Sequence, residues 1–318
     1  MKRTIYILFA LFILSGHDMF LKLDSYFLEP NKPASIHLYN GTFDRSDNAI
    51  TRDRMLDVTI KGNSQSITPG DSMWTDVGPT SVLNFLAENS GTYVAGVSTA
   101  ARSIEMSAED FNGYLEHDGV LDVLEQRKKE GTTGAAAVEK YSKHVKVIFQ
   151  VGEEKTSDWD TNLNYPIEFI PQSNPYELKI GDKISAVLLR DGKPLVNQLV
   201  QWGTESHEHE DGHTHEESGE DHKHNEVQLR TNSKGIVETQ ISASGKWYFR
   251  TIHMIDSKEE GFTHESNWAT ITFEVLEGEN SAGHTHDHVH NTALPWYVWG
   301  VGLLMIMMIF YLLWSRRV

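Results

Sequence analysis

Apolar and polar residues alternate with a period of two along most of the chain, which is the pattern of β-strands that bury one face. Alternating segments recur between turn residues over positions 20–152, and again over positions 176–275. The Asp191-Gly192 pair separates two of the later segments, and this dipeptide is typical of a tight hairpin turn. The sequence therefore predicts a mainly β fold.

The strand segments form two groups, which predict two β-sandwich-like modules. An N-terminal β-rich domain is expected at residues 17–155. A C-terminal β-sandwich is expected at residues 156–278, because the spacing of its short strands is typical of immunoglobulin-like or transthyretin-like folds.

One segment changes to a helical period. Ser107-Ala108-Glu109-Asp110 resembles a capping box, and apolar residues follow it at spacings of three and four. Gly119 is expected to separate two short helices. We therefore predict a short helical insert at residues 107–130 that packs against the strands. Its apolar positions are Phe111, Tyr114, Leu115, Val120, Leu121 and Leu124.

The N-terminus has the pattern of a signal peptide over residues 1–16. Lys2 and Arg3 precede an apolar run that ends at Leu14, and the small residues Ser15-Gly16 follow. The run is too short to span a bilayer, although an uncleaved anchor remains the alternative. Cleavage after Gly16 would make His17 the first residue of the mature chain.

The C-terminus has the pattern of a membrane anchor. Residues 295–314 carry no charge, match the length of a spanning helix and have Trp and Tyr at both ends. The arginines of residues 315–318 indicate a cytoplasmic tail. We therefore expect a single-pass protein of the inner (cytoplasmic) membrane, with the bulk of the chain in the periplasm.

Charge and composition exclude several function classes. The chain has 318 residues, a formal net charge of −17 and no cysteine. Nucleic acids and anionic lipids need a basic footprint, so we expect neither as a partner, whereas cations are compatible. Thiolate metal sites and cysteine nucleophiles are excluded. The sequence contains no GxSxG, GxGxxG or P-loop motif, so we expect that it is not an enzyme.

Histidine is concentrated in two tracts, a loop at residues 206–224 and a linker at residues 279–294. In each tract His-x-His pairs place two imidazoles on one side of an extended chain, and carboxylates lie between them. Neutral imidazole suits nickel, cobalt, zinc and copper, so we predict that the tracts bind a divalent transition metal. The tract histidines are His207, His209, His213, His215, His222, His224, His284, His286, His288 and His290.

A second, better-ordered metal site is predicted at His17. A terminal histidine offers its amine and its ring nitrogen to one metal, and another histidine would complete an arrangement similar to a histidine brace. His253 and His264 are the candidates, because they flank a short connection between two strand segments. Met19 and Met254 could add soft ligands for copper. His37, His117 and His144 are interpreted as structural.

Several segments resemble a bacterial family of exported proteins of unknown function that is associated with the periplasmic component of cobalt or nickel uptake. The resemblance covers most of residues 17–277, and the helical insert and GKWYFRTIHM are its more specific parts. It implies two β-rich modules and a transition-metal role, and it does not include the loop at 206–224. The segments are HDMFLKL, FNGYLEHDGVLDVLEQRKKEG, EKYSKHVKVIFQVG, GDKISAVLLRDGKPLVNQLVQW, GKWYFRTIHM and ESNWATITFEV.

Together these features predict a membrane-anchored protein that captures a divalent transition metal outside the cytoplasm and delivers it to an integral membrane metal transporter. A single spanning helix cannot form a transport path, so a membrane partner is implied. Two alternatives remain open. One is a binding or adhesion module whose histidines buffer zinc or sense pH, and the other is an exported copper enzyme.

Overall fold

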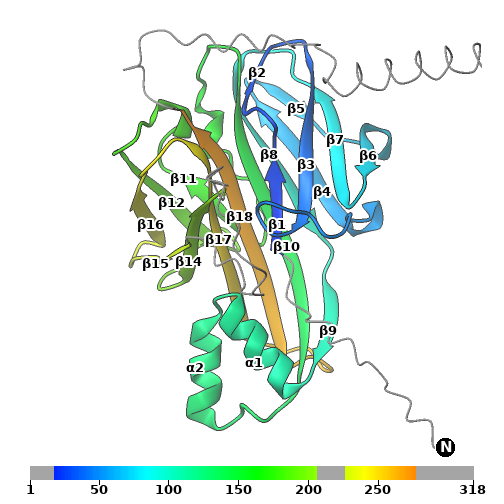
Figure 1. Ribbon diagram of the computed structural model, residues 1–318, viewed down its shortest axis with the longest axis vertical. Helices are drawn as coiled ribbons and strands as arrows, with labels where there is room; N and C mark the ends of the chain where they lie inside the picture. Colours follow the sequence, from blue (N-terminus) through cyan, green and yellow to red (C-terminus); the bar gives the residue numbers. More distant parts are fainter. Residues whose placement is uncertain (1–17, 206–225, 277–318) are drawn as a thin grey trace, which may run out of the picture. The chain divides into compact units, whose positions relative to one another are not determined.

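The computed structural model describes residues 18–205 and 226–276. As predicted, this part of the chain is mainly β, with three sheets and two α-helices (Figure 1). Four 3₁₀ turns connect the strands, at Arg52–Arg54, Asp71–Met73, Ser157–Asp160 and Pro175–Glu177. No helix of the described residues is long and apolar enough to cross a membrane. The predicted signal peptide and the predicted segments 279–294, 295–314 and 315–318 lie outside the described residues.

The central sheet combines strands from nearly the whole described chain. It runs in the order β15-β14-β17-β18-β10-β8-β4-β5, and β2 and β9 also pair with β10. All described pairings of this sheet are antiparallel except β10 with β18 and β10 with β2. The strands are β2 (Phe27–Leu28), β4 (Met55–Gly62), β5 (Gln65–Ile67), β8 (Gly91–Thr99), β9 (Arg102–Met106), β10 (Ala137–Val151), β14 (Leu199–Thr204), β15 (Val227–Arg230), β17 (Gly245–Asp256) and β18 (His264–Val275).

Two smaller sheets cover the two faces of the central sheet. The first has the order β1-β3-β7-β6 and comes from the N-terminal part of the chain, and the second consists of β11, β12, β13 and β16. Their strands are β1 (Asp18–Lys22), β3 (Pro33–Gly41), β6 (Trp74–Val77), β7 (Thr80–Leu86), β11 (Ile167–Pro171), β12 (Lys183–Arg190), β13 (Lys193–Pro194) and β16 (Ile236–Gln240).

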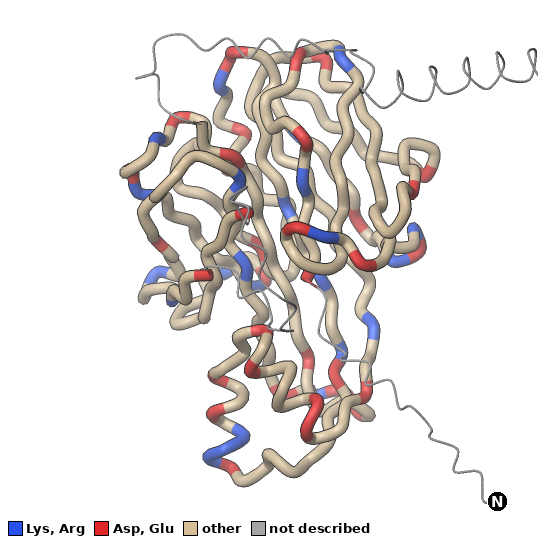
Figure 2. The backbone as a smooth tube through the Cα atoms, viewed as in Figure 1, with Lys and Arg blue, Asp and Glu red and all other residues tan. Residues whose placement is uncertain are grey.

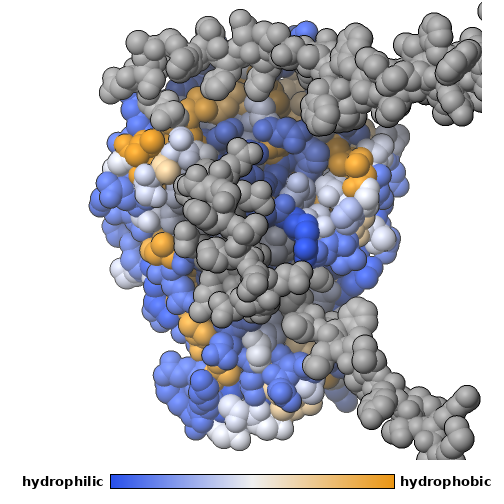
Figure 3. Space-filling model, in the orientation of Figure 1, coloured by the Kyte–Doolittle hydropathy of each residue, from blue (hydrophilic) through white to orange (hydrophobic). Residues whose placement is uncertain are grey.

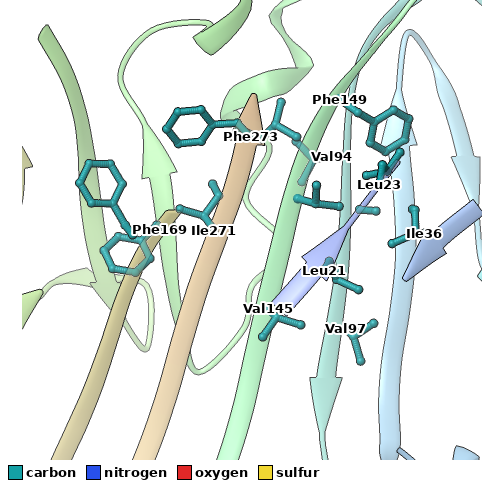
Figure 4. Close-up of a cluster of buried hydrophobic side chains, with 14 of the residues drawn as sticks. Leu21, Leu23, Ile36, Val94, Val97, Val145, Phe149, Phe169, Ile271 and Phe273 are labelled. Carbon is teal, nitrogen blue, oxygen red and sulfur yellow. The ribbon is translucent and has the colours of Figure 1, made fainter. Parts of the chain in front are cut away.

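Alternation along β18 and β10 decides which small sheet packs on which face. Thr270 and Thr272 donate hydrogen bonds to backbone carbonyls of β1, whereas Ile271 and Phe273 point to the opposite face. Figure 4 shows Phe169 of β11 with Ile271 and Phe273, and Leu21 with Val145 and Val97 on the other side. One hydrophobic core therefore runs through all three layers.

The central sheet crosses the predicted boundary between residues 155 and 156. β10 precedes that boundary and β18 follows it, yet the two strands pair in parallel over nine positions, from Glu139–His264 to Val147–Thr272. The strands that the alternation predicts are present, but the pairing between distant segments joins the two expected modules through one sheet.

The helical insert forms as predicted, as α1 (Ala108–His117) and α2 (Leu121–Glu130). Ser107 caps α1, and its hydroxyl accepts a hydrogen bond from the backbone N–H of Asp110 at 3.1 Å. Gly119 separates the helices with a φ of +74°, in the region that favours glycine. Phe111 and Leu115 bury against the ends of β17 and β18 (Figure 1).

The apolar surface left exposed is scattered. Leu56, Val77 and Val227 are among the exposed large hydrophobic residues, and they come from three different strands. On the face shown in Figure 3, apolar patches of the described residues are small and separated by hydrophilic surface. Single exposed apolar residues are normal, so they mark no docking surface.

Candidate functional site

Five charged side chains gather where β1 and the helical insert meet on the same face of the central sheet. We call this group the charged junction. Charged positions occur inside the central strands as well as in the loops, as Figure 2 shows. Arg250 and Lys143 are only 4% exposed, and Asp118 is 5% exposed. The members of the junction are Asp18, Asp118, Lys143, Glu226 and Arg250.

Arg250 is the centre of the junction. Alternation along β17 puts it on the same face as Ile252 and Met254, which is the face that β1 and the insert cover. Its Nη1 lies 3.1 Å from Oδ1 of Asp18, and its Nη2 lies 3.6 Å from Oε2 of Glu226. These two carboxylates compensate a guanidinium that would otherwise be buried without a counter-charge.

Burial perturbs both acidic and basic members. It raises the pKa of Asp18 to about 7, against the opposing effect of Arg250, and Asp118 and Glu226 add to the increase. Burial lowers the pKa of Lys143 to about 8. Perturbed groups that face one another in this way are typical of functional sites, although structural ion networks produce them too.

Lys143 is positioned by its neighbours on three strands. Its Nζ donates to Oδ1 of Asn40 over 3.3 Å and lies 4.8 Å from the ring centroid of Trp268. Its backbone N–H donates to the hydroxyl of Thr99. Lys143 therefore lies close to the start of β1, because its partner Asn40 pairs with Met19, the second residue of that strand.

Two atoms of the junction are buried without a hydrogen-bond partner, Oδ2 of Asp118 and Nε of Arg250. The other oxygen of Asp118 is 3.0 Å from Nδ1 of His117. Buried polar atoms are normally satisfied, and those that are not often mark a functional or strained position. The junction is thus less fully paired than Lys146 and Glu168, a buried pair on the opposite face.

The two ends of the histidine-rich loop are anchored along β1. Glu205, just before the loop, places Oε1 2.6 Å from Nζ of Lys22. Glu226, just after it, accepts a hydrogen bond from the hydroxyl of Tyr248 at 2.7 Å and contacts Arg250. Since Lys22 ends β1 and Asp18 begins it, both loop anchors lie beside this one strand.

His253 and His264 do not converge on one point. In the pairing of β17 with β18, His253 faces Asn267 and His264 faces Asp256. The two histidines are therefore three register positions apart, which directs their side chains to opposite faces of the sheet.

Each of these histidines has local partners. Nδ1 of His253 lies 2.9 Å from Oε1 of Gln198. His264 contacts the hydroxyl of Thr263, and its ring centroid is 4.7 Å from that of Phe111. Burial lowers the pKa of both histidines. Within residues 18–205 and 226–276, no group of three or more His, Asp and Glu side chains could hold a metal ion.

The remaining predicted ligands differ in what the structure says of them. Met19 and Met254 are buried in the hydrophobic clusters of β1 and of the insert. His144, which was interpreted as structural and not as a ligand, is buried and hydrogen-bonded to Ser98 and Ser142. The following predicted ligands lie outside the described residues: His17, His207, His209, His213, His215, His222, His224, His284, His286, His288 and His290.

Sequence reasoning did not identify the charged junction. One signal was available, since Lys143 and Arg250 stand at positions where alternation predicts an inward side chain. A charged residue at such a position needs a buried partner. The partners come from β1, from the end of α1 and from the segment before β15, and no local pattern links those segments.

A family profile described as a domain of unknown function, DUF4198, matches residues 14–255. The chain belongs to this family. The matched region contains every member of the charged junction and both α-helices. The family description names no activity and no ligand, so it agrees with the expected family of unknown function without addressing cobalt or nickel. No match is found among curated proteins.

Solved structures resemble the chain only distantly. A *Corynebacterium diphtheriae* putative membrane anchored protein is 10% identical, with 83% of this chain and 60% of that chain covered and a TM-score of 0.21. *Escherichia coli* alpha-2-macroglobulin activated by porcine elastase is also 10% identical, with 81% of this chain covered and a TM-score of 0.18. This chain spans 20% of the length of that protein. Such low TM-scores support no structural argument.

Proposed function

We propose that this protein is a membrane-anchored, extracytoplasmic binder of a divalent transition metal, nickel, cobalt, zinc or copper, which it delivers to an integral membrane transporter. Two sequence features support the metal, namely the histidine tracts and the histidine that would begin a processed chain. The uncharged C-terminal segment supports the membrane location.

The contact of both Asp18 and Glu226 with Arg250 is the observation that best supports this function. One peptide bond joins His17 to Asp18, and two join His224 to Glu226. His17 and the end of the loop therefore adjoin two members of the junction in the sequence. This supports a metal site that combines His17 with a second histidine, for which His253, His264 and the loop histidines are the candidates.

The loop and linker histidines would act as collectors that feed this site. Nothing preorganises an extended His-x-His pair, so the tract sites should be numerous and weak. Tethering them to the same chain raises the metal concentration beside the ordered site. All such sites should weaken as the pH falls through about 6.5, where free imidazole becomes protonated.

Metal titration by calorimetry tests the proposal on the full-length protein in detergent, with Ni²⁺, Co²⁺, Zn²⁺ and Cu²⁺. One variant carries Asn at every tract histidine, which preserves chain length and carboxylates. A second carries one extra residue before His17, and mass spectrometry establishes the N-terminus of each protein. We expect many weak sites and one tight site, with the tract variant keeping the tight site at reduced affinity. If wild-type protein binds none of the four ions, the proposed function is wrong.

A further inference from the structure

Arg54 is a buried arginine, and one edge of its guanidinium group makes no hydrogen bond within the described residues. It ends the 3₁₀ turn η1 (Arg52–Arg54) just before β4, and it is 8% exposed. Its Nε and Nη2 are both buried and have no hydrogen-bond partner among residues 18–205 and 226–276. No carboxylate of the described residues lies within ion-pair distance of its guanidinium, although Asp53 is its neighbour in sequence.

The two unpartnered nitrogens define a specific chemistry. In a guanidinium group, the N–H bonds of Nε and Nη2 point along the same edge as two parallel donors. That edge matches two oxygens of a carboxylate or a phosphate, and the resulting bidentate contact is among the strongest hydrogen-bonded pairs in proteins. A single water offers one oxygen to this edge, whereas a carboxylate or a phosphate offers two oxygens and a negative charge.

A second cation lies beside the same aromatic ring. Cζ of Arg54 is 5.6 Å from the ring centroid of Tyr141, and Nζ of Lys143 is 5.9 Å from it. In addition to burial, the charge of Arg54 lowers the pKa of Lys143, so the two buried cations act on each other, and an anion near both would stabilise them. Lys143 also donates to Asn40, so its ammonium is already oriented.

The carboxylates of the charged junction do not supply that anion to Arg54. Asp18 and Asp118 act on Lys143, where they oppose the effect of burial on its pKa. Burial is the main cause that lowers the pKa of Arg54, Tyr141 opposes it through its charge and a side-chain hydrogen bond, and Arg102 lowers it further. The carboxylate that acts on Arg54 is the exposed Asp53. Lys143 therefore has buried carboxylates near it, whereas Arg54 has no buried carboxylate among the described residues.

We propose that Arg54 and Lys143 form an anion site, in which the Nε–Nη2 edge of Arg54 binds two oxygens of a small carboxylate or phosphate and Lys143 contributes a second positive charge. The site lies next to the start of β1, through Asn40 and its partner Met19. It does not depend on metal binding, because neither Arg54 nor Lys143 is a proposed metal ligand.

Thermal unfolding of the full-length protein in detergent tests the site. The probes are sodium acetate and sodium phosphate, compared with sodium chloride at the same ionic strength and pH. A ligand that binds only the folded state raises Tm progressively with its concentration. We expect acetate, phosphate or both to raise Tm above the chloride value. Acetate alone would identify a carboxylate site and phosphate alone a phosphate site.

Matched variants locate the effect. R54Q removes the two-donor edge, and we expect it to weaken anion binding by about tenfold to a hundredfold. R54K keeps the positive charge but lacks the two parallel donors, so it should also bind the anion more weakly than wild type. Because it keeps the charge, R54K should fold even if R54Q does not. R102Q is the control, because Arg102 lies opposite Tyr141 in the β9–β10 pair but its side chain is 50% exposed.

Three results would overturn the proposal. One is a wild-type protein in which neither acetate nor phosphate changes Tm beyond chloride. The second is an anion effect of equal size in wild type, R54K and R54Q, since it would show that the anions act elsewhere. The third is a loss of the anion effect on Tm in R102Q as large as the loss in R54Q, since it would show that the effect depends on general surface charge.

Discussion

Nη1 of Arg250 lies 3.1 Å from Oδ1 of Asp18, in a buried contact between residues separated by 232 positions in the sequence. This contact joins the first described residue of the chain to the centre of β17. It fixes the start of β1 on the central sheet, and the same guanidinium also holds Glu226, which follows the histidine-rich loop.

Arg250→Met should therefore destabilise the fold strongly. The substitution keeps much of the side-chain length but leaves the partly buried Asp18 and Glu226 without their cation. Removing one partner of a buried pair typically costs about 3–5 kcal/mol. Urea denaturation of the full-length protein, followed by tryptophan fluorescence, gives the change in the free energy of unfolding.

Arg230→Met is the matched control for this prediction. Arg230 also forms a guanidinium–carboxylate pair, with Asp122 at 2.8 Å, but both side chains are more than a third exposed. An exposed pair is worth about 0–1 kcal/mol. Equal losses in the two variants would contradict the central role of Arg250.

His144→Gln should flatten the pH dependence of stability in the acid range. Burial lowers the pKa of His144 to about 4, with a smaller contribution from Arg190, and its Nδ1 lies 2.9 Å from the Ser98 hydroxyl. An unfolded chain binds the proton near pH 6.5. Between these values the unfolded state holds more protons than the folded state, so acidification favours unfolding.

The contribution of His144 is thus fully present above about pH 6.5 and declines as the pH falls towards 4, by roughly 1.4 kcal/mol per pH unit. We expect the free energy of unfolding of His144→Gln to fall less steeply over this interval than that of wild type. Parallel wild-type and His144→Gln curves would show that His144 titrates normally.

Local patterns predicted the local structure well. Ser107 caps α1, Gly119 separates the helices, and Asp191-Gly192 forms the two-residue turn between β12 and β13. Each is encoded within a few residues, by a side chain that accepts a nearby N–H or by a backbone that tolerates positive φ. The short strands β5, β6 and β9 were not predicted, because too few residues alternate in them.

Contacts between distant segments could not be predicted from one sequence. Alternation shows that Arg250 and Lys143 point inward, but it carries no information on which segment supplies Asp18 or Asn40. The parallel pairing of β10 with β18 could not be predicted either, because the alternation within each strand does not show which other strand it pairs with. For the same reason His253 and His264 looked close in sequence, while their register places them on opposite faces.

Lys146→Met should destabilise the protein, and Glu168→Gln should partly restore it. Nζ of Lys146 lies 2.9 Å from Oε2 of Glu168, and both side chains are at most 2% exposed. Methionine fills the space of lysine but leaves the carboxylate uncompensated, at a cost of about 3–5 kcal/mol. Glutamine removes that charge, although it can accept fewer of the hydrogen bonds that Leu163 and Tyr165 donate to Glu168.

Urea denaturation of the two single variants and the double variant measures the coupling of this pair. We expect the double variant to be more stable than Lys146→Met alone. Lys183→Met is the control, because Lys183 pairs with Glu238 at 2.6 Å on the exposed side of the small sheet. A double variant whose loss equals the sum of the single losses would show that the charges do not interact.

Gly119→Ala should loosen the helical insert from the central sheet. Gly119 has a φ of +74°, and an added Cβ would lie 2.0 Å from Nε2 of Gln201 in β14. Alanine therefore meets both an unfavourable backbone conformation and a steric clash, which together should cost about 1–3 kcal/mol. Hydrogen exchange of the α1 and α2 amides would report the loosening separately from global unfolding.

Gly113→Ala provides the matched comparison within the same insert. Gly113 lies inside α1, and an added Cβ would meet nothing within 4 Å. Alanine is favoured over glycine there by about 0.5–1 kcal/mol, so this variant should be more stable than wild type. Adding Gln201→Ala to Gly119→Ala removes the clash but leaves the positive φ. Recovery of stability in that pair would assign the loss to the contact with β14, and no recovery would assign it to the backbone.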